Sequence, residues 1–179
     1  GSRGAGTNTM KKTLLAAAVI AFGGIALNAS ATTVTGQFTV SLKVNSTCIV
    51  NTSGSSDITL GPVIAGATTT VQSGAFSVNC SNKTPFTVGL APSNNNTAGA
   101  GVLTAPSGGT IAYQLYSDAG TTTWGNTAAV GSTGNGKSGT GAGMASAKAV
   151  AFTAYANATG STDVQPDTYS DTVTINVNF

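Results

Sequence analysis

Alternation of apolar and polar side chains limits the fold of this sequence more than any other feature. Apolar or glycine residues alternate with polar ones from Val34 to Val44, and the same pattern returns from Val173 to Phe179. A period of two is typical of a β-strand with one buried face. No stretch of useful length has the 3.6-residue period of an amphipathic helix.

Shorter runs of the same kind lie between these two ends. Turn-rich pieces separate them, at residues 51–56, 92–101, 106–109 and 131–143. Short strands at this spacing are typical of an antiparallel sandwich. The sequence therefore predicts an all-β fold. Its shorter strands are expected at residues 58–60, 76–80, 86–90, 111–115 and 150–152.

Composition excludes several classes of function. The 179 residues include 7 Lys or Arg, 5 acidic residues that are all Asp, and no His. Without His or Glu the usual general bases and most metal ligands are missing, so we expect no enzyme, no metal and no cofactor. A net charge of +2 cannot provide a surface that follows phosphates, so nucleic acid is not an expected partner. No small-molecule substrate is expected either.

The first part of the sequence has the three parts of a secretory signal peptide. Lys11 and Lys12 follow Met10, an apolar run of about 14 residues extends over 14–27, and Ala29-Ser30-Ala31 precedes the expected cut. The apolar run is too short to span a bilayer. We therefore expect a signal peptide at 10–31, preceded by a remnant at 1–9. The mature chain, 32–179, then has four Lys against five Asp, a net charge of −1.

Export gives the two cysteines a role. Cys48 and Cys80 would enter an oxidising compartment, where two cysteines allow one intramolecular disulfide. Free or intermolecular thiols are the alternative.

The two alternating ends are unusual for a self-contained domain. The C-terminal run is strongly apolar and has neither charge nor proline, which makes an uncovered strand edge prone to association. The N-terminal run is long enough to begin the domain near Cys48 while residues 32–42 extend away. A free strand and an uncovered edge would make a head-to-tail contact that gives fibres. The other interpretation is that the N-terminal strand folds back into its own sandwich, and the pattern alone leaves both open.

Several motifs resemble those of chaperone–usher pilins. Residues 32–38 (TTVTGQF) and 45–50 (NSTCIV) look like the start of a mature pilin, with a second cysteine some thirty residues later. More specific are 113–118 (YQLYSD), 123–126 (TWGN) and 166–174 (PDTYSDTVT), which resemble the spore coat protein U-like domain of archaic chaperone–usher pili. One departure is Asp167, where the resemblance leads us to expect glycine.

The resemblance implies an incomplete immunoglobulin-like sandwich of six strands that receives its missing strand from a neighbour. A donor strand at 32–42 would precede a pilin domain at 43–179. A periplasmic chaperone would lend a strand beside the C-terminal strand and capture the Phe179 carboxylate, and an outer-membrane usher would exchange it. The expected partners are these two proteins, identical subunits, and minor or tip pilins. The donor face would be Val34, Gly36, Phe38, Val40 and Leu42, and the acceptor groove would have Val173, Ile175, Val177 and Phe179 on one wall.

Strand exchange would build an extracellular pilus used for attachment and biofilm formation, with Gly36 at a shallow site where exchange can begin. The alternative is a self-complete secreted sandwich that binds glycans or coat components. One motif indicates a third function, because residues 131–138 (GSTGNGKS) match the phosphate-binding loop of nucleotide hydrolases. That chemistry needs a buried strand before the loop and a helix after it, and the flanking sequence favours neither. We therefore interpret 131–138 as a surface loop.

Overall fold

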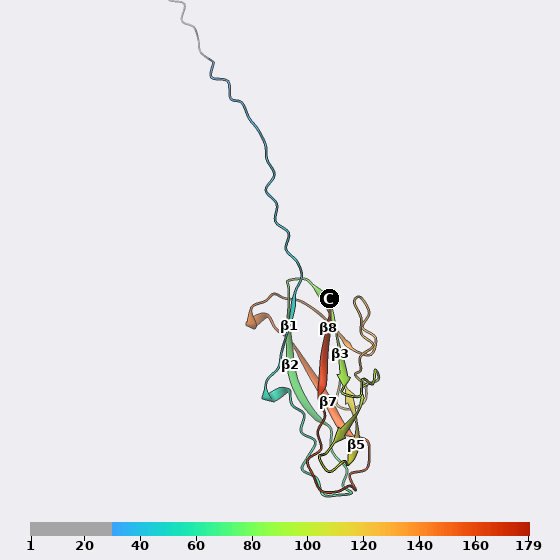
Figure 1. Ribbon diagram of the computed structural model, residues 1–179. Coiled ribbons are helices and arrows are strands. Elements are labelled where there is room, and N and C mark those ends of the chain that lie inside the picture. The colour runs from blue at the N-terminus through green and yellow to red at the C-terminus, as the bar shows by residue number, and fades with distance from the viewer. Residues whose placement is uncertain (1–29) are drawn as a thin grey trace, which may run out of the picture. The chain divides into compact units, whose positions relative to one another are not determined.

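The computed structural model describes residues 30–179, and the chain divides into two units (Figure 1). In the first unit, residues 30–41 have no regular secondary structure. The second unit begins at Leu42 and contains all the strands of the described chain. The proposed remnant at 1–9 and nearly all of the proposed signal peptide at 10–31 lie outside the described residues.

The second unit is an antiparallel β-sandwich, which confirms the all-β prediction (Figure 1). One sheet has the order β1-β2-β7-β5-β4 and the other β6-β3-β8. Two single 3₁₀ turns, η1 (Gly54–Ser56) and η2 (Ser146–Lys148), are the helical elements of the described residues, and no helix there is long and apolar enough to cross a membrane. The strands are β1 (Cys48–Asn51), β2 (Gln72–Cys80), β3 (Pro85–Pro92), β4 (Ala100–Thr104), β5 (Thr110–Tyr116), β6 (Lys137–Thr140), β7 (Val150–Ala158) and β8 (Val173–Asn178).

An aromatic cluster joins the two sheets. The ring of Phe152 on β7 lies 5.6 Å from that of Phe76 on β2 and 6.0 Å from that of Phe86 on β3. Trp124 completes the cluster at 6.1 Å from Phe152 and is fully buried. Its Nε1 donates to the Val88 carbonyl at 2.9 Å, so the indole has its polar atom satisfied in the core.

The strand predictions were correct for β2, β3, β5, β7 and β8 and wrong for residues 58–60. Ile58 and Leu60 lie in an irregular segment, although both pack against the core. β4 and β6 were not predicted. β6 has no apolar alternation because it is an edge strand, and its Gly139 lies against a ring: a Cβ there would be 2.4 Å from Cζ of Phe86.

The loop that resembles a phosphate-binding motif leads into a strand. Lys137, the motif's lysine, is the first residue of β6, and no helix follows it. Its Nζ donates to the Ser117 carbonyl at 3.4 Å and lies 5.9 Å from the centre of the Trp124 ring. The helix N-terminus that would hold phosphates is therefore missing from this part of the described chain.

Candidate strand-acceptor groove

The C-terminal strand has one paired edge and one open edge. β8 pairs with β3, from Thr87 opposite Asn178 to Pro92 opposite Val173, and lies at the end of its sheet. Val173, Ile175 and Val177 pack against the core but remain only half-buried. An apolar strand in this state has both unpaired backbone groups and apolar surface to offer a further strand.

A large apolar groove opens beside this edge. Its volume is about 850 Å³, and both sheets contribute to it. The floor consists of core side chains that the alternation of β2, β3, β5 and β7 turns inward. The apolar lining includes Ile58, Leu60, Phe76, Leu90, Leu103, Ile111, Tyr113, Leu115, Ala154, Ala156, Val173 and Ile175.

The irregular segment after β1 forms a further wall of the groove. Gly74 on β2 allows this segment to lie directly on the sheet, because a Cβ there would be 2.2 Å from the Ser56 carbonyl oxygen. Ser56 Oγ then donates to the Ala75 carbonyl at 2.7 Å. These contacts place Ile58 and Leu60 in the groove even though neither belongs to a strand.

Polar contacts hold the start of β8. Tyr113 is 4 % exposed, and its hydroxyl donates to Asp171 Oδ2 at 2.7 Å. Burial, followed by the hydrogen bond to Asp171 and its charge, raises the pKa of Tyr113 well above its usual value. Asp171 also accepts from the Thr172 amide at 2.8 Å, so the carboxylate joins the groove floor to the entry of β8.

Asp167, which replaces the expected glycine, has a structural role in the same rim. Its carboxylate accepts from the Ser107 amide at 3.1 Å and from the Thr168 amide at 2.7 Å. Its hydrogen bonds hold the pKa of Asp167 below its usual range, with the Ser107 side chain contributing most. The φ angle of Asp167 is not positive, so this turn does not require glycine.

The structure separates the four predicted acceptor residues. Val173 and Ile175 line the groove, whereas Val177 packs on the core without lining it. Phe179 is 46 % exposed and lines a second hollow together with Ser46, Lys83 and Val130. Sequence reasoning missed the floor residues on β5 and the Ile58–Leu60 wall as parts of this site, although the alternation of 111–115 already indicated an inward face there.

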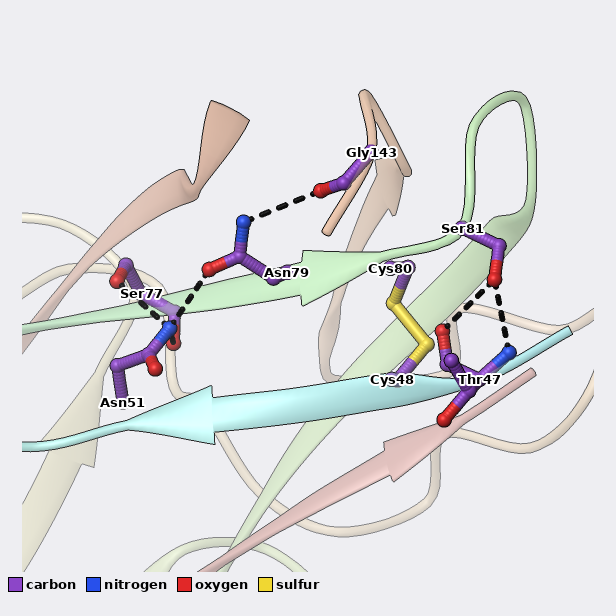
Figure 2. The surroundings of a disulfide bond; sticks show 8 residues. All are labelled: Thr47, Cys48, Asn51, Ser77, Asn79, Cys80, Ser81 and Gly143. Atoms are coloured by element: carbon purple, nitrogen blue, oxygen red, sulfur yellow. Dashed lines mark hydrogen bonds between the residues drawn. A yellow bond between two sulfur atoms is a disulfide. The ribbon is translucent and has the colours of Figure 1, made fainter. Parts of the chain in front are cut away.

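The disulfide confirms the predicted pairing and lies where the chain enters the sandwich. Cys48 and Cys80 are opposite each other on β1 and β2 (Figure 2). Beside them, the Thr47 amide donates to Ser81 Oγ at 3.0 Å, and the Ser81 amide donates to the Thr47 carbonyl at 2.9 Å. On the other side, Asn51 Nδ2 donates to Asn79 Oδ1 at 2.9 Å. The start of β1 is therefore fixed to β2 by covalent and polar contacts.

The predicted donor residues are solvent-exposed. Val34, Phe38, Val40 and Leu42 are 94, 90, 84 and 89 % exposed, respectively. No atom outside its neighbours lies within 4 Å of a Cβ placed on Gly36. Residues 33–47 form no strand in the described chain, so their alternation has no partner there.

The motifs, the sandwich and the groove all agree with one family. Residues 34–176 match the Spore Coat Protein U domain. This chain is a member of the Spore Coat Protein U domain family. Spore Coat Protein U (SCPU) domains are structural and non-enzymatic, so the chain is not an enzyme. No curated protein sequence matches the chain.

The chain is similar to several solved structures, the first of which shares its fold. One is the CsuC–CsuE chaperone–tip adhesion subunit pre-assembly complex of archaic chaperone–usher Csu pili from Acinetobacter baumannii, with 19% identity and a TM-score of 0.51 over 76% of this chain. Another is a chaperone–tip adhesin complex of CFA/I fimbriae, with 11% identity and a TM-score of 0.41 over 73% of this chain. The chain spans about two fifths of the length of these matches, at 40% and 41%.

Proposed function

We propose that this SCPU domain is a structural subunit of a chaperone–usher pilus that polymerises by donating its N-terminal strand. The open apolar groove beside β8 is the observation that carries the proposal. The exposed alternating segment 32–42 supplies what such a groove binds, a strand with one apolar face. Because one chain both gives and receives a strand, it can occupy the interior of a head-to-tail polymer.

The energetics support this function. Burying the four large apolar side chains of the donor face is worth roughly 6–12 kcal/mol in total, as an upper estimate from about 1.5–3 kcal/mol each. That sum is comparable to the whole stability of a domain, about 5–15 kcal/mol. A sandwich with this groove open is therefore expected to be marginal alone and very stable once the groove is filled.

The groove also supports a proposal for the partners. Before assembly, a periplasmic chaperone would cover the β8 edge with a strand of its own, as expected for a surface prone to aggregation. An outer-membrane usher would then exchange that strand for residues 32–42 of the next subunit, without ATP, because the final packing is tighter. This is the role of a rod subunit such as the major rod subunit of an archaic Csu-type pilus, which joins minor and tip pilins in a surface fibre for attachment and biofilm formation.

Polymer formation by the purified chain tests this proposal. Purified chain 32–179 should give ladders of multimers on unheated SDS gels and monomers after boiling. A variant that lacks 32–42 should give no ladder, because it can receive a strand but not donate one. A stable monomer from the intact chain would contradict the proposal and favour a self-complete sandwich that binds glycans.

A further inference from the structure

The smaller sheet has two edges, and each of them presents the outer backbone of an edge strand. Its order is β6-β3-β8, so β6 and β8 both lie at an end. An edge strand can pair with any strand that is available, because its outer N–H and C=O groups have no partner. A polymer that grows by adding a strand to β8 must therefore avoid the same addition at β6.

The two edge strands differ at the same position across β3. Val88, which is fully buried, is opposite Val177 on β8 and opposite Lys137 on β6. Residues directly opposite each other in an antiparallel pair lie on the same face of the sheet. Lys137 therefore belongs to the inward face, as Val177 does. Where β8 places a valine beside the core, β6 places a charge.

The contacts of Lys137 agree with this inward position. Its Nζ lies 5.9 Å from the centre of the buried Trp124 ring and donates to the Ser117 carbonyl at 3.4 Å. Neither partner carries a charge. Lys137 is partly exposed, so water at the open side of β6 reaches its side chain. A further strand along β6 would remove that water from the ammonium group, and neither partner offsets the resulting loss of hydration free energy.

We infer that Lys137 prevents β6 from accepting a strand of a second copy of this chain and thereby confines strand addition to β8. The inference rests on the proposed strand donation. Inward-pointing charges on edge strands are a means by which native sheets avoid edge-to-edge pairing. The next inward residue of β6 is Gly139, which lies against the Phe86 ring and offers no apolar side chain to an incoming strand. Selection of β8 thus depends on rejection at β6 as well as on attraction at β8.

Fibres of the intact chain 32–179 provide the first test. Lys137→Met removes the charge but keeps a long, unbranched side chain beside Trp124. Fibres of this variant should associate side by side through β6 and form bundles in electron micrographs, whereas fibres of the parent chain should stay single. Lys148→Met is the matched control, because Lys148 is exposed and lies in η2 rather than on a strand.

Single fibres from Lys137→Met, or equal bundling by the two variants, would overturn the inference while leaving strand donation intact. Failure of the parent chain to form ladders would contradict the proposed function itself.

A chain with a filled groove tests the β6 edge alone. When the donor segment is deleted through Phe38 and relinked after Phe179, it should cover β8, so that self-association has to use another edge. Lys137→Met should lower the apparent Kd of self-association of this chain roughly tenfold or more. Lys137→Arg, which keeps the charge, should leave that Kd unchanged.

Hydrogen exchange identifies the edge that associates. In the associated Lys137→Met variant, the backbone amides of residues 137–140 should exchange more slowly than in the monomer, because a new strand pairs with them. Unchanged self-association of Lys137→Met would overturn the inference. Association without this protection would also overturn it, because partial unfolding or a different surface would then be responsible.

Discussion

The two ends of this chain have the same alternation but different structures. Residues 173–178 form β8, whereas residues 34–44 form no strand and expose their apolar side chains. β8 forms a strand because it has a partner strand. It pairs with β3 from Pro92 to Thr87, in a register that puts inward residues opposite inward residues. The comparison teaches that alternation specifies which face of a strand can be buried, and that the strand forms only where an edge is available.

The largest expected effect comes from placing a charge on the donor face. Phe38→Asp should abolish ladders. The free energy needed to bury an unpaired carboxylate in an apolar groove far exceeds the free energy gained by binding the strand. Gln37→Asp is the matched control, because residue 37 has the opposite parity and faces outward in any register that buries Phe38. The two variants are compared on unheated SDS gels. Equal ladders from both would show that residues 34–42 do not enter the groove with this face.

The next-largest effect concerns the disulfide that joins β1 to β2. Replacing Cys48 and Cys80 by Ser should lower the free energy of unfolding by about 3–4 kcal/mol, as expected for a closed loop of this length. The measurement is urea denaturation of a monomer whose groove is filled by the donor segment relinked after Phe179, because the sandwich with an open groove is only marginally stable. A loss well below 1 kcal/mol would show that the polar contacts of Thr47 and Ser81 hold β1 without the disulfide.

A paired substitution separates the two ends most clearly. Ile175→Ala, on β8, should lower the stability of the monomer by about 1–3 kcal/mol, because the side chain packs on the core but is only half-buried. Val40→Ala should leave the monomer unchanged, because Val40 is exposed there, but should lower the temperature at which ladders dissociate. Thermal unfolding of the monomer and ladder melting give the two readouts. A monomer destabilised by Val40→Ala would mean that this residue is buried in its own chain.

The smallest effect is a pH dependence at the start of β8. The pKa of Tyr113 is raised in the folded chain, so its contribution to stability is complete below the ordinary value of 10.0 and is lost as the pH rises above it. Tyr113→Phe should therefore cost about 1 kcal/mol at neutral pH through the lost hydrogen bond and give a shallower loss of stability above pH 10. Unfolding curves between pH 7 and 11 test this. Parallel alkaline losses in both proteins would contradict it.

The sequence predicted the parts of the fold that depend on alternation. The strands around Phe76, Phe86, Leu115 and Phe152 were found in this way, and two cysteines in a chain expected to be exported predicted the disulfide. β6 was missed because its inward position is a glycine beneath Phe86, which period-two reasoning does not count.

The groove could be predicted only in part, because most of its lining residues are brought together only by tertiary packing. The alternation of 173–179 indicated its β8 wall, and Ile58 and Leu60 were recognised as apolar but assigned to a strand. The contact of Tyr113 with Asp171 and that of Asp167 with Ser107 join residues about sixty positions apart. No local pattern reports such pairs. The role of residues 32–42 as a donor stays a prediction, because it depends on a second copy of the chain.

The most direct test of strand donation is to give the groove its strand within one chain. Thermal unfolding is compared for 32–179, for a variant deleted through Phe38, and for that deletion with the donor segment relinked after Phe179. We predict that the intact chain forms fibres, that the deleted chain is barely folded, and that the relinked chain is a monomer far more stable than either. An intact chain that stays a stable monomer, with nothing gained by relinking, would show that the sandwich is already complete and would contradict the account.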